Sequence, residues 1–198
     1  MSLYIATLAE VKADLGISDT ADDAVLTRTL EGLQGRFEAR CNRLFARAEN
    51  VTEYFDGGTR ALYVQRYPIE SVASVIIDSD RVFGSEDALV EDDDYVLNQE
   101  QGTIIWSGVH GWPSYVVARA IQVVYTGGYV AAGTTPSAGQ FPMPEGLRGA
   151  FLLQAGFEWR NRLNLGKQSV GAQGANVSLA PAKLLPEVES VLGPFVRM

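Results

Sequence analysis

The spacing of apolar residues changes from helical to alternating and back again along this chain of 198 residues. Apolar residues recur every three or four positions up to about Arg47, and again after Pro144. Between Val51 and Tyr125 they form short runs rich in β-branched and aromatic residues, which is typical of strands. Because strands and helices do not alternate, a doubly wound parallel sheet is excluded. The pattern predicts an α+β fold: a helical frame with an inserted small antiparallel β module and an extended C-terminal arm.

Residues 1–49 are predicted to form an N-terminal helical pair. Thr7 and Glu10 have the spacing of a capping box, and Gly16 ends this short helix. Asp19 or Thr20 is expected to cap the next helix. That helix is long and amphipathic, because its apolar residues share one side: Val25, Leu26, Leu30, Leu33, Phe37, Cys41, Leu44 and Phe45.

Two glycines, Gly32 and Gly35, lie inside the long predicted helix, where each costs about 1 kcal/mol relative to alanine. Close approach of another helix would explain them, and so would a tolerated imperfection. The sequence leaves both explanations open.

Residues 50–130 are predicted to form the antiparallel β module. Six runs read as strands: VTEYF, RALYV, SVASVII, DYVL, GTIIW and YVVARAIQVVY. Asp56-Gly57-Gly58 predicts a hairpin between the first two strands. Asn98 to Gly102 predicts the turn between the fourth and fifth, and Tyr67-Pro68 interrupts the chain before the third.

The remaining residues divide into a linker (131–144), a third helix packing on the first two (145–163), and a flexible linker with an apolar C-terminal arm (164–198). Leu147, Phe151, Ala155 and Trp159 mark one side of the third helix. Gly149 and Gly156 are spaced seven apart, which would let another helix come close. Residues 164–180 have almost no core-forming pattern and are expected to be mobile when free.

The composition excludes several classes of function. A net charge of −8 and a pI of about 4.7 lack the basic patches that bind nucleic acid or anionic membranes. No signal peptide and no apolar run long enough to span a bilayer are found. Cys41, the single cysteine, is interpreted as a small core residue. We expect a soluble protein made in a reducing cytoplasm.

No segment has a catalytic pattern. His110 is the only histidine, so a metal site with two histidines is impossible, and a Ser-His-Asp triad would have to use His110, although no serine lies in a G-x-S-x-G motif. The acidic run Glu91–Asp94 lacks the spaced ligands of a calcium loop and is interpreted as a solvated turn. Asp56–Gly58 and Thr126–Gly128 lack the spacing of a phosphate-binding loop. We therefore predict no enzymatic activity, no cofactor and no metal.

Two surface features point to partners instead. Arg36, Arg40, Arg43 and Arg47 recur at helical spacing and would meet acidic groups, stabilise the helix end, or simply be solvated. The arm carries an apolar set consisting of Leu184, Leu185, Val188, Val191, Leu192 and Phe195. It either folds back on its own domain or orders on a partner by laying its apolar side into a groove.

Taken in order, these segments resemble the head–tail connector proteins (adaptor or head-completion proteins) of long-tailed phages and phage-like gene transfer agents. The resemblance covers about residues 5 to 163. It rests on the opening LAEVKADLGISDTADDAVLTRTLEGLQGRFEARCNRLF, on EYFDGG, LYVQRYPIESVASVIID, DYVLNQEQGTIIW and IQVVYTGGY, and on the helix LRGAFLLQAGFEWRNR. Small members of that family are almost wholly helical, so the sheet matches only the larger ones.

The resemblance implies a structural adaptor. Copies, typically twelve, would form a ring in the neck of the particle between the portal protein and a tail-side stopper or terminator protein. DNA would pass through the ring without sequence-specific binding. The C-terminal arm, with Leu184, Leu185, Val188, Val191, Leu192 and Phe195, would reach the portal. Neighbouring copies would use the long helix, through Leu26, Leu30, Leu33, Arg36, Phe37, Arg40 and Arg43.

Two alternatives remain. The chain could be another neck or tail component, such as a stopper or tail terminator, although the two N-terminal helices count against these mainly β proteins. It could also be an uncharacterised hydrolase that uses His110 and the acidic run, although the sequence offers no second catalytic partner. The adaptor interpretation places the protein in the particle neck, and in the host cytoplasm during assembly.

Overall fold

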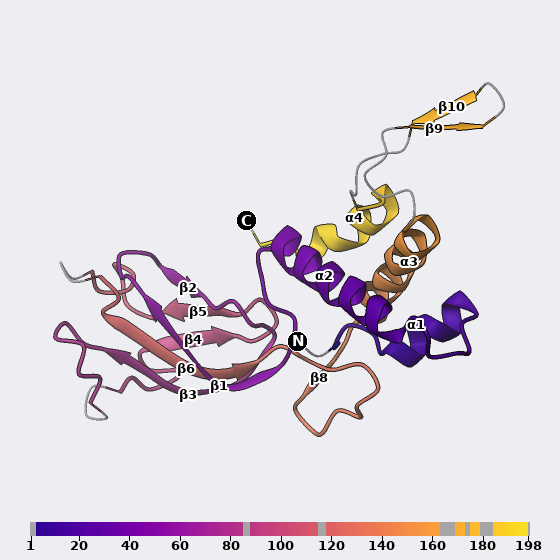
Figure 1. Ribbon diagram of the computed structural model, residues 1–198. Helices are drawn as coiled ribbons and strands as arrows, with labels where there is room; N and C mark the ends of the chain where they lie inside the picture. The colour runs from indigo at the N-terminus through magenta and orange to yellow at the C-terminus, as the bar shows by residue number, and fades with distance from the viewer. Residues whose placement is uncertain are drawn as a thin grey trace. The chain divides into compact units, whose positions relative to one another are not determined.

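The computed structural model describes residues 3–84, 88–114, 118–162, 169–172, 175–178 and 184–197. The chain divides into two compact units (Figure 1). The helical unit contains Met1–Asn42, Ala131–Gly133 and Met143–Met198, and the β unit contains Arg43–Val130 and Thr134–Pro142. The predicted α+β architecture, with an antiparallel β module inserted in a helical frame, is confirmed.

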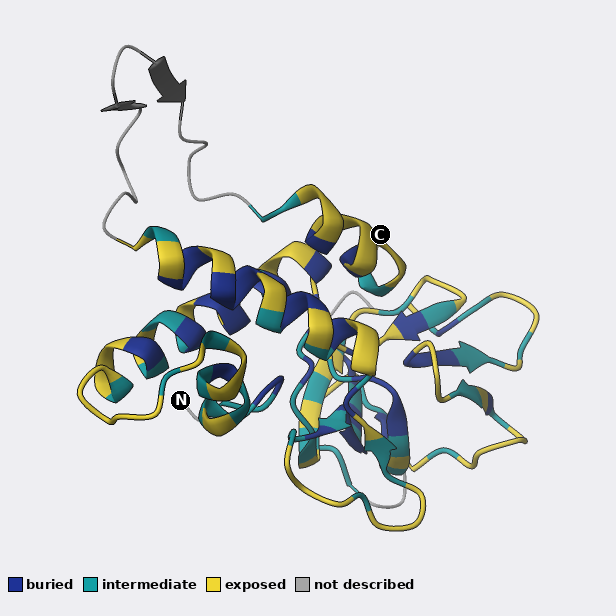
Figure 2. Ribbon diagram, turned by 90° about the vertical axis from the view of Figure 1, so that its right-hand side faces the viewer, coloured by how far each residue is buried: buried dark blue, intermediate teal, exposed yellow. Residues whose placement is uncertain are grey.

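The helical unit is built around the long helix α2 (Asp23–Cys41) and helix α3 (Glu145–Asn161). Helix α1 (Leu8–Leu15) contacts both of them. Helix α4 (Pro186–Leu192), continued by the 3-10 helix η2 (Gly193–Phe195), packs mainly on α3. Buried residues follow the facing sides of these helices (Figure 2). The apolar residues of α2 and α3 therefore meet in one core, in which the rings of Phe37 and Phe151 are 5.5 Å apart.

The caps of α1 and α2 differ. The capping box of α1 is confirmed, because Glu10 N donates to Thr7 Oγ1 at 3.2 Å and Thr7 N donates to Glu10 Oε2 at 2.8 Å. The prediction that Asp19 or Thr20 caps α2 is wrong, because that helix starts after Asp22. Asp19 instead accepts a hydrogen bond from Ala21 N at 3.0 Å, within the turn that precedes the helix.

The β unit contains two antiparallel sheets of three strands. The first has the order β1 (Ala48–Phe55), β6 (Ile121–Gly127), β3 (Ile69–Ile77). The second has the order β2 (Ala61–Tyr63), β5 (Thr103–Trp106), β4 (Tyr95–Asn98). Short strands β7 (Tyr129–Val130) and β8 (Phe141–Pro142) pair in parallel. In the helical unit, β9 (Ser169–Ala172) and β10 (Ala175–Ser178) form an antiparallel pair.

The core of the β unit is aromatic. Trp112 is 1% exposed, and its Nε1 donates to Ile104 O at 3.2 Å. The centroid of its ring lies 4.9 Å from the ring centroid of Trp106 and 6.4 Å from that of Tyr95. Tyr125 is also fully buried and donates its hydroxyl to Glu53. Residues from both sheets and from the loop that carries Trp112 thus form a single cluster.

The predicted hairpin at Asp56-Gly57-Gly58 is wrong. Strand β1 pairs with β6 and strand β2 pairs with β5, so the two strands around this turn lie in different sheets. The glycines serve close packing instead, because a Cβ on Gly57 would lie 1.6 Å from Pro113 O. By contrast, the turn from Asn98 to Gly102 is confirmed by the pairing of β4 with β5.

Several expectations concern residues in the C-terminal part of the chain. Within the segment 164–180, residues 164–168, 173–174 and 179–180 lie outside the described residues, as do 181–183. The described parts of that segment are strands β9 and β10. Residues 131–133 of the expected linker belong to the helical unit, and 134–142 belong to the β unit.

Candidate assembly surfaces

The C-terminal arm folds back on the helical unit. Val188 and Leu192 are both 0% exposed, since α4 packs on α3 and α2. Hydrogen bonds hold both ends: Leu185 N donates to Gln154 Oε1 at 2.9 Å, and Arg197 N donates to Cys41 O at 3.0 Å. The other residues expected to bind the portal are more accessible, with Val191 37% exposed and Leu184, Leu185 and Phe195 half-buried.

The inner side of α2 is occupied within its own subunit. Of the residues expected to contact a neighbouring copy, Leu26 is 1% exposed and Leu30, Leu33 and Phe37 are 0% exposed. Arg36 pairs with Glu158 of α3, while Arg40 is exposed. The apolar residues lie inside because their helical spacing faces α3 and α4. Cys41 is likewise buried, as predicted for a core residue.

The outer side of α2 has few large side chains. Its exposed residues are mostly small, and Gly32 and Gly35 would gain no neighbour within 4 Å if they carried a Cβ. An exposed helix side normally carries charged and polar residues. Within Asp23–Cys41 the exposed residues are Ala24, Val25, Arg28, Gly32, Gly35, Ala39 and Arg40. Among the described residues, nothing packs against these two glycines.

Polar groups inside the helical unit fix the positions of its helices. Glu158 is 6% exposed, accepts from Arg36, and accepts from Gln154 Nε2 at 2.8 Å. Gln34 of α2 accepts from Tyr4 N at 2.7 Å and from Ile5 N at 3.2 Å. A buried polar group that lost such a partner would be costly, so these contacts specify how α2, α3 and the N-terminal segment pack.

A second ion pair joins α1 to α3, between Glu10 and Arg148. Arg148 also pairs with Glu145 at 3.0 Å. Burial raises the pKa of Glu10, but the hydrogen bonds from Thr7 and the charge of Arg148 outweigh it, and the pKa ends below its ordinary value. Glu10 thus has two roles, since it closes the capping box of α1 and ties that helix to α3.

Arg43 is a buried cation. Helical spacing predicted it on the long helix, but it belongs to the β unit. It follows the end of α2, is 4% exposed, and donates to Tyr67 O. Its guanidinium carbon lies 3.2 Å from the centroid of the Tyr67 ring and 4.9 and 5.4 Å from those of Phe45 and Tyr129. Burial lowers its pKa. No spacing signal reveals this aromatic cage, because its members come from three distant segments.

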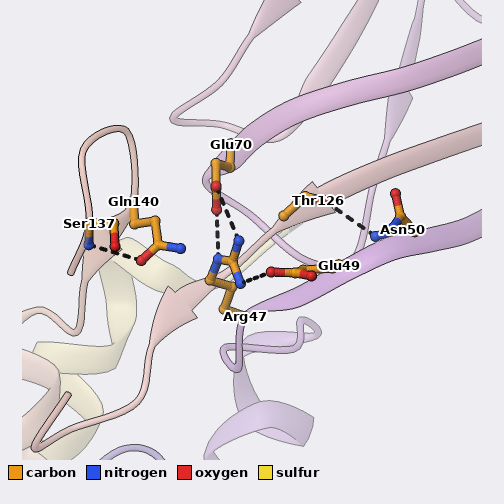
Figure 3. Close-up of polar contacts among 7 residues, drawn as sticks. All are labelled: Arg47, Glu49, Asn50, Glu70, Thr126, Ser137 and Gln140. Atoms are coloured by element: carbon orange, nitrogen blue, oxygen red, sulfur yellow. Dashed lines mark hydrogen bonds and ion pairs between the residues drawn. The ribbon is translucent and has the colours of Figure 1, made fainter. Parts of the chain in front are cut away.

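Arg47 also lies in the β unit, beyond the end of α2. Its guanidinium makes two contacts to Glu70 of β3, at 2.6 and 3.1 Å, and one to Glu49 of β1 at 2.7 Å (Figure 3). Nearby, Asn50 N donates to Thr126 Oγ1 at 3.3 Å. The bidentate contact with Glu70 raises the pKa of Arg47. The expected arginine stripe is therefore divided between an exposed residue (Arg40), a helix–helix ion pair (Arg36), an aromatic cage (Arg43) and a strand-bridging pair (Arg47).

The segments considered for catalysis lie at the surface of the β unit. His110 is exposed on the loop after β5. The acidic run Glu91–Asp94 is confirmed as a turn, within which Asp94 Oδ2 accepts from Val90 N at 2.8 Å. Among the described residues no cluster of His, Cys, Asp and Glu could hold a metal ion. In the same part of the chain, no helix has the length and apolar character needed to cross a bilayer.

Comparison of sequences gives one family. Residues 5–100 match the family described as phage gp6-like head-tail connector protein. This segment contains the helical pair and most of the β unit. The matched family is one of structural connectors, not of enzymes. No curated protein matches the chain.

Comparison of folds extends the likeness to nearly the whole chain. A chain in the neck of an empty gene transfer agent (GTA) particle, computed with C6 symmetry, has a TM-score of 0.57 and 16% identity, with 96% of this chain and 89% of that chain covered. One in the neck of a native GTA particle, computed with C12 symmetry, has a TM-score of 0.56 and 14% identity over 96% and 88%. One in the virion of a native GTA particle has a TM-score of 0.53 and 16% identity over 96% and 89%.

At these identities the structural matches show a shared fold, and the family match supplies the sequence relation. The resemblance seen in the sequence is therefore confirmed at both levels: residues 5–100 have the sequence pattern of the phage gp6-like head-tail connector family, and the chain has the fold of a protein in the neck of gene transfer agent particles.

Proposed function

We propose that this chain is a structural adaptor in the neck of a tailed phage or a gene transfer agent particle. Copies form a ring that joins the portal to the tail-side neck proteins and continues the DNA channel. The observation that carries this function is the match of residues 5–100 to the connector family, together with the neck-protein fold of the chain. The protein acts by assembly in the particle neck, and it reaches that place from the host cytoplasm.

The ring contains twelve copies in this proposal, which the C12 symmetry of one matching neck supports. Its partners are the portal protein on one side and a stopper or terminator protein on the other. Weak contacts suffice for each copy, because a closed ring engages its partners at many points at once and the effective concentration of each further contact is high.

The charge of the chain suits a DNA channel. A subunit with net charge −8 repels phosphates, and a ring of such subunits multiplies the effect. Tight binding to DNA requires clustered Lys and Arg that release counterions, which this composition lacks. DNA therefore passes the ring without sequence-specific attachment.

The C-terminal arm is our proposed portal contact. Val188 and Leu192 anchor it on the helical unit, where both are fully buried. Val191, together with the half-buried Leu184, Leu185 and Phe195, is then left to face the portal. Truncation of residues 181–198 is a poor test, because it would also remove Val188 and Leu192 from the core.

Cryo-electron microscopy of the particle neck tests the adaptor function. We expect density for this chain as a ring directly beneath the portal, and its absence from assembled particles would overturn the proposal. Binding of the purified chain to purified portal tests the arm. We expect Val191→Asp to reduce binding, whereas the control Val109→Asp, at an 85% exposed position of the β unit, leaves it unchanged. Equal binding by both variants would reject the arm and leave the ring in place.

A further inference from the structure

We infer that neighbouring copies in the ring meet through two different helix faces, the outer face of α2 on one copy and the outer face of α3 on the next. The inference rests on the proposed adaptor function and adds the surfaces that build the ring. The α2 face consists of Ala24, Arg28, Gly32, Gly35, Ala39 and Arg40, and the α3 face of Gly149, Leu153 and Phe157.

The α2 face consists largely of small residues. Glycine is the poorest helix former after proline, yet two glycines stand in the middle of this helix with no neighbour within 4 Å of a Cβ. Gly32, Gly35 and Ala39 follow one another at intervals of three and four residues, so they form a stripe of small residues on one side of the helix. Small residues of this kind let a second helix approach closely.

The α3 face provides bulky apolar side chains that would pack against the small residues of the α2 face. Leu153 is 50% exposed and Phe157 is 39% exposed, four residues apart on one side of the helix. Gly149, one turn before Leu153, has nothing within 4 Å of a Cβ. Two large apolar side chains adjacent on a helix surface exceed the isolated exposed residue that needs no explanation.

Charged residues border both faces. On α2, Arg28 and Arg40 are exposed, and the half-buried Glu31 and Glu38 lie within one turn of Gly35. On the α3 side, Asp14 Oδ2 lies 3.7 Å from the position of a Cβ on the buried Gly156.

Two different faces are what a closed ring requires. In a ring each subunit presents one surface to the neighbour on its left and another to the neighbour on its right, whereas a twofold dimer uses one surface twice. The α2 face consists largely of small residues, whereas the α3 face carries the large apolar side chains of Leu153 and Phe157. A second copy of this chain is thus the occupant to which both faces point.

The glycines allow a test that separates assembly from folding. Because Gly32 and Gly35 face open space, Gly32→Leu with Gly35→Leu should raise the unfolding midpoint of the subunit through better helix propensity. The same variant should lower the number of copies bound per portal, measured by native mass spectrometry, by about tenfold at subsaturating concentration. Ala9→Leu, at an exposed position of α1, is the matched control and should leave assembly unchanged.

Cysteine cross-linking tests the pairing itself. The variant Gly35→Cys with Leu153→Cys, bound to the portal and oxidised, should give a ladder of covalent multimers. Each single-cysteine variant alone should give none, because α2 does not meet α2 and α3 does not meet α3. A mixture of the two single variants should stop at dimers. Buried Cys41 provides an internal background control.

The outcomes are distinguishable. Normal rings from the double-leucine variant, or symmetric dimers from either single-cysteine variant, would overturn these faces while leaving the adaptor function intact. Absence of any wild-type ring on the portal would instead overturn the adaptor function and, with it, the ring contact.

Discussion

The helical unit and the β unit expose apolar residues in different ways. In the β unit the most exposed ones, Val109 at 85% and Val82 at 77%, are single loop residues, and Tyr54, Tyr63 and Val96 are exposed singly on three different strands. In the helical unit they stand in helical register, as Leu153 and Phe157 do on α3. Scattered exposed residues are ordinary, whereas ordered ones mark surfaces that another molecule covers. The difference supports the proposed contact between helices of neighbouring copies.

The two units also complete their cores differently. The β unit is formed mainly by the continuous stretch Arg43–Val130, while the helical unit joins segments from both ends of the chain. The helical core is complete only when α4 has docked on α3. This comparison leads to five predictions, given from the largest expected effect to the smallest.

Trp112→Ala should have the largest effect, about 3–5 kcal/mol of unfolding free energy, because it empties the centre of the aromatic cluster. Urea denaturation followed by circular dichroism measures the loss. We expect the β signal to disappear first and the helical signal to survive. Simultaneous loss of both signals would show that the two units unfold as one.

Leu192→Ala should lower the free energy of unfolding by about 2–5 kcal/mol, because the side chain of this last residue of α4 is fully buried. The control Val191→Ala removes a side chain that is 37% exposed and should cost far less. Hydrogen exchange should show faster exchange in α4 of the Leu192 variant. Equal stability of the two variants would mean that α4 is not part of the core in solution.

Arg36→Ala should cost about 1–2 kcal/mol, because it leaves the buried Glu158 carboxylate with one partner fewer while Arg36 itself is partly exposed. Arg40→Ala, one turn along the same helix, is the control and should change stability by less than about 0.5 kcal/mol. Thermal denaturation at low and high salt compares the two. An equal effect at both positions would contradict the special role of the Arg36–Glu158 pair.

Thr7→Ala should cost about 1 kcal/mol, because it removes the side chain that caps α1. Thr20→Ala, in the uncapped turn before α2, should be close to neutral. Denaturant midpoints of the two variants decide the matter. The contrast would vanish if Thr20 capped α2 in solution.

The last prediction has no effect at neutral pH and is a pH dependence of the β unit's stability at alkaline pH. Burial, followed by the charges of Glu91, Asp92 and Asp94, raises the pKa of Tyr95 to about 12. The unfolded chain then loses this proton at lower pH than the folded one, so stability falls as the pH rises from about 10 to about 12. Tyr95→Phe should reduce the slope of that part of the pH profile, measured by urea midpoints, and the remaining slope reflects Tyr125 and Tyr129, whose pKa values burial also raises. An unchanged slope would exclude this group as the cause.

Local signals predicted local structure well. The capping box of Thr7 and Glu10, the turn at Asn98–Gly102 and the buried position of Cys41 depend on residues close in sequence or on helical spacing. The resemblance to connector proteins likewise came from the order of such segments. These features were accessible because each depends on spacing or propensity within a short window.

Non-local contacts were not accessible. The pairing of β1 with β6 instead of β2 depends on residues about 70 positions apart, and it defeated the hairpin expected at Asp56. Docking of α4 depends on Gln154, 31 residues before Leu185. The apolar pattern of the arm showed that it must be covered, but nothing within the pattern says by what. The cage around Arg43 escaped notice for the same reason.

The pairing of Ala46 with Tyr129 has a consequence for how such chains can vary. These two residues lie at the entrance and the exit of the β unit, so its ends are neighbours in space. A cassette with adjoining ends can be enlarged, replaced or deleted without rerouting the polypeptide on either side. Differences in length among related chains should therefore concentrate between these two positions, and a short loop in place of the whole cassette should leave the helices to fold.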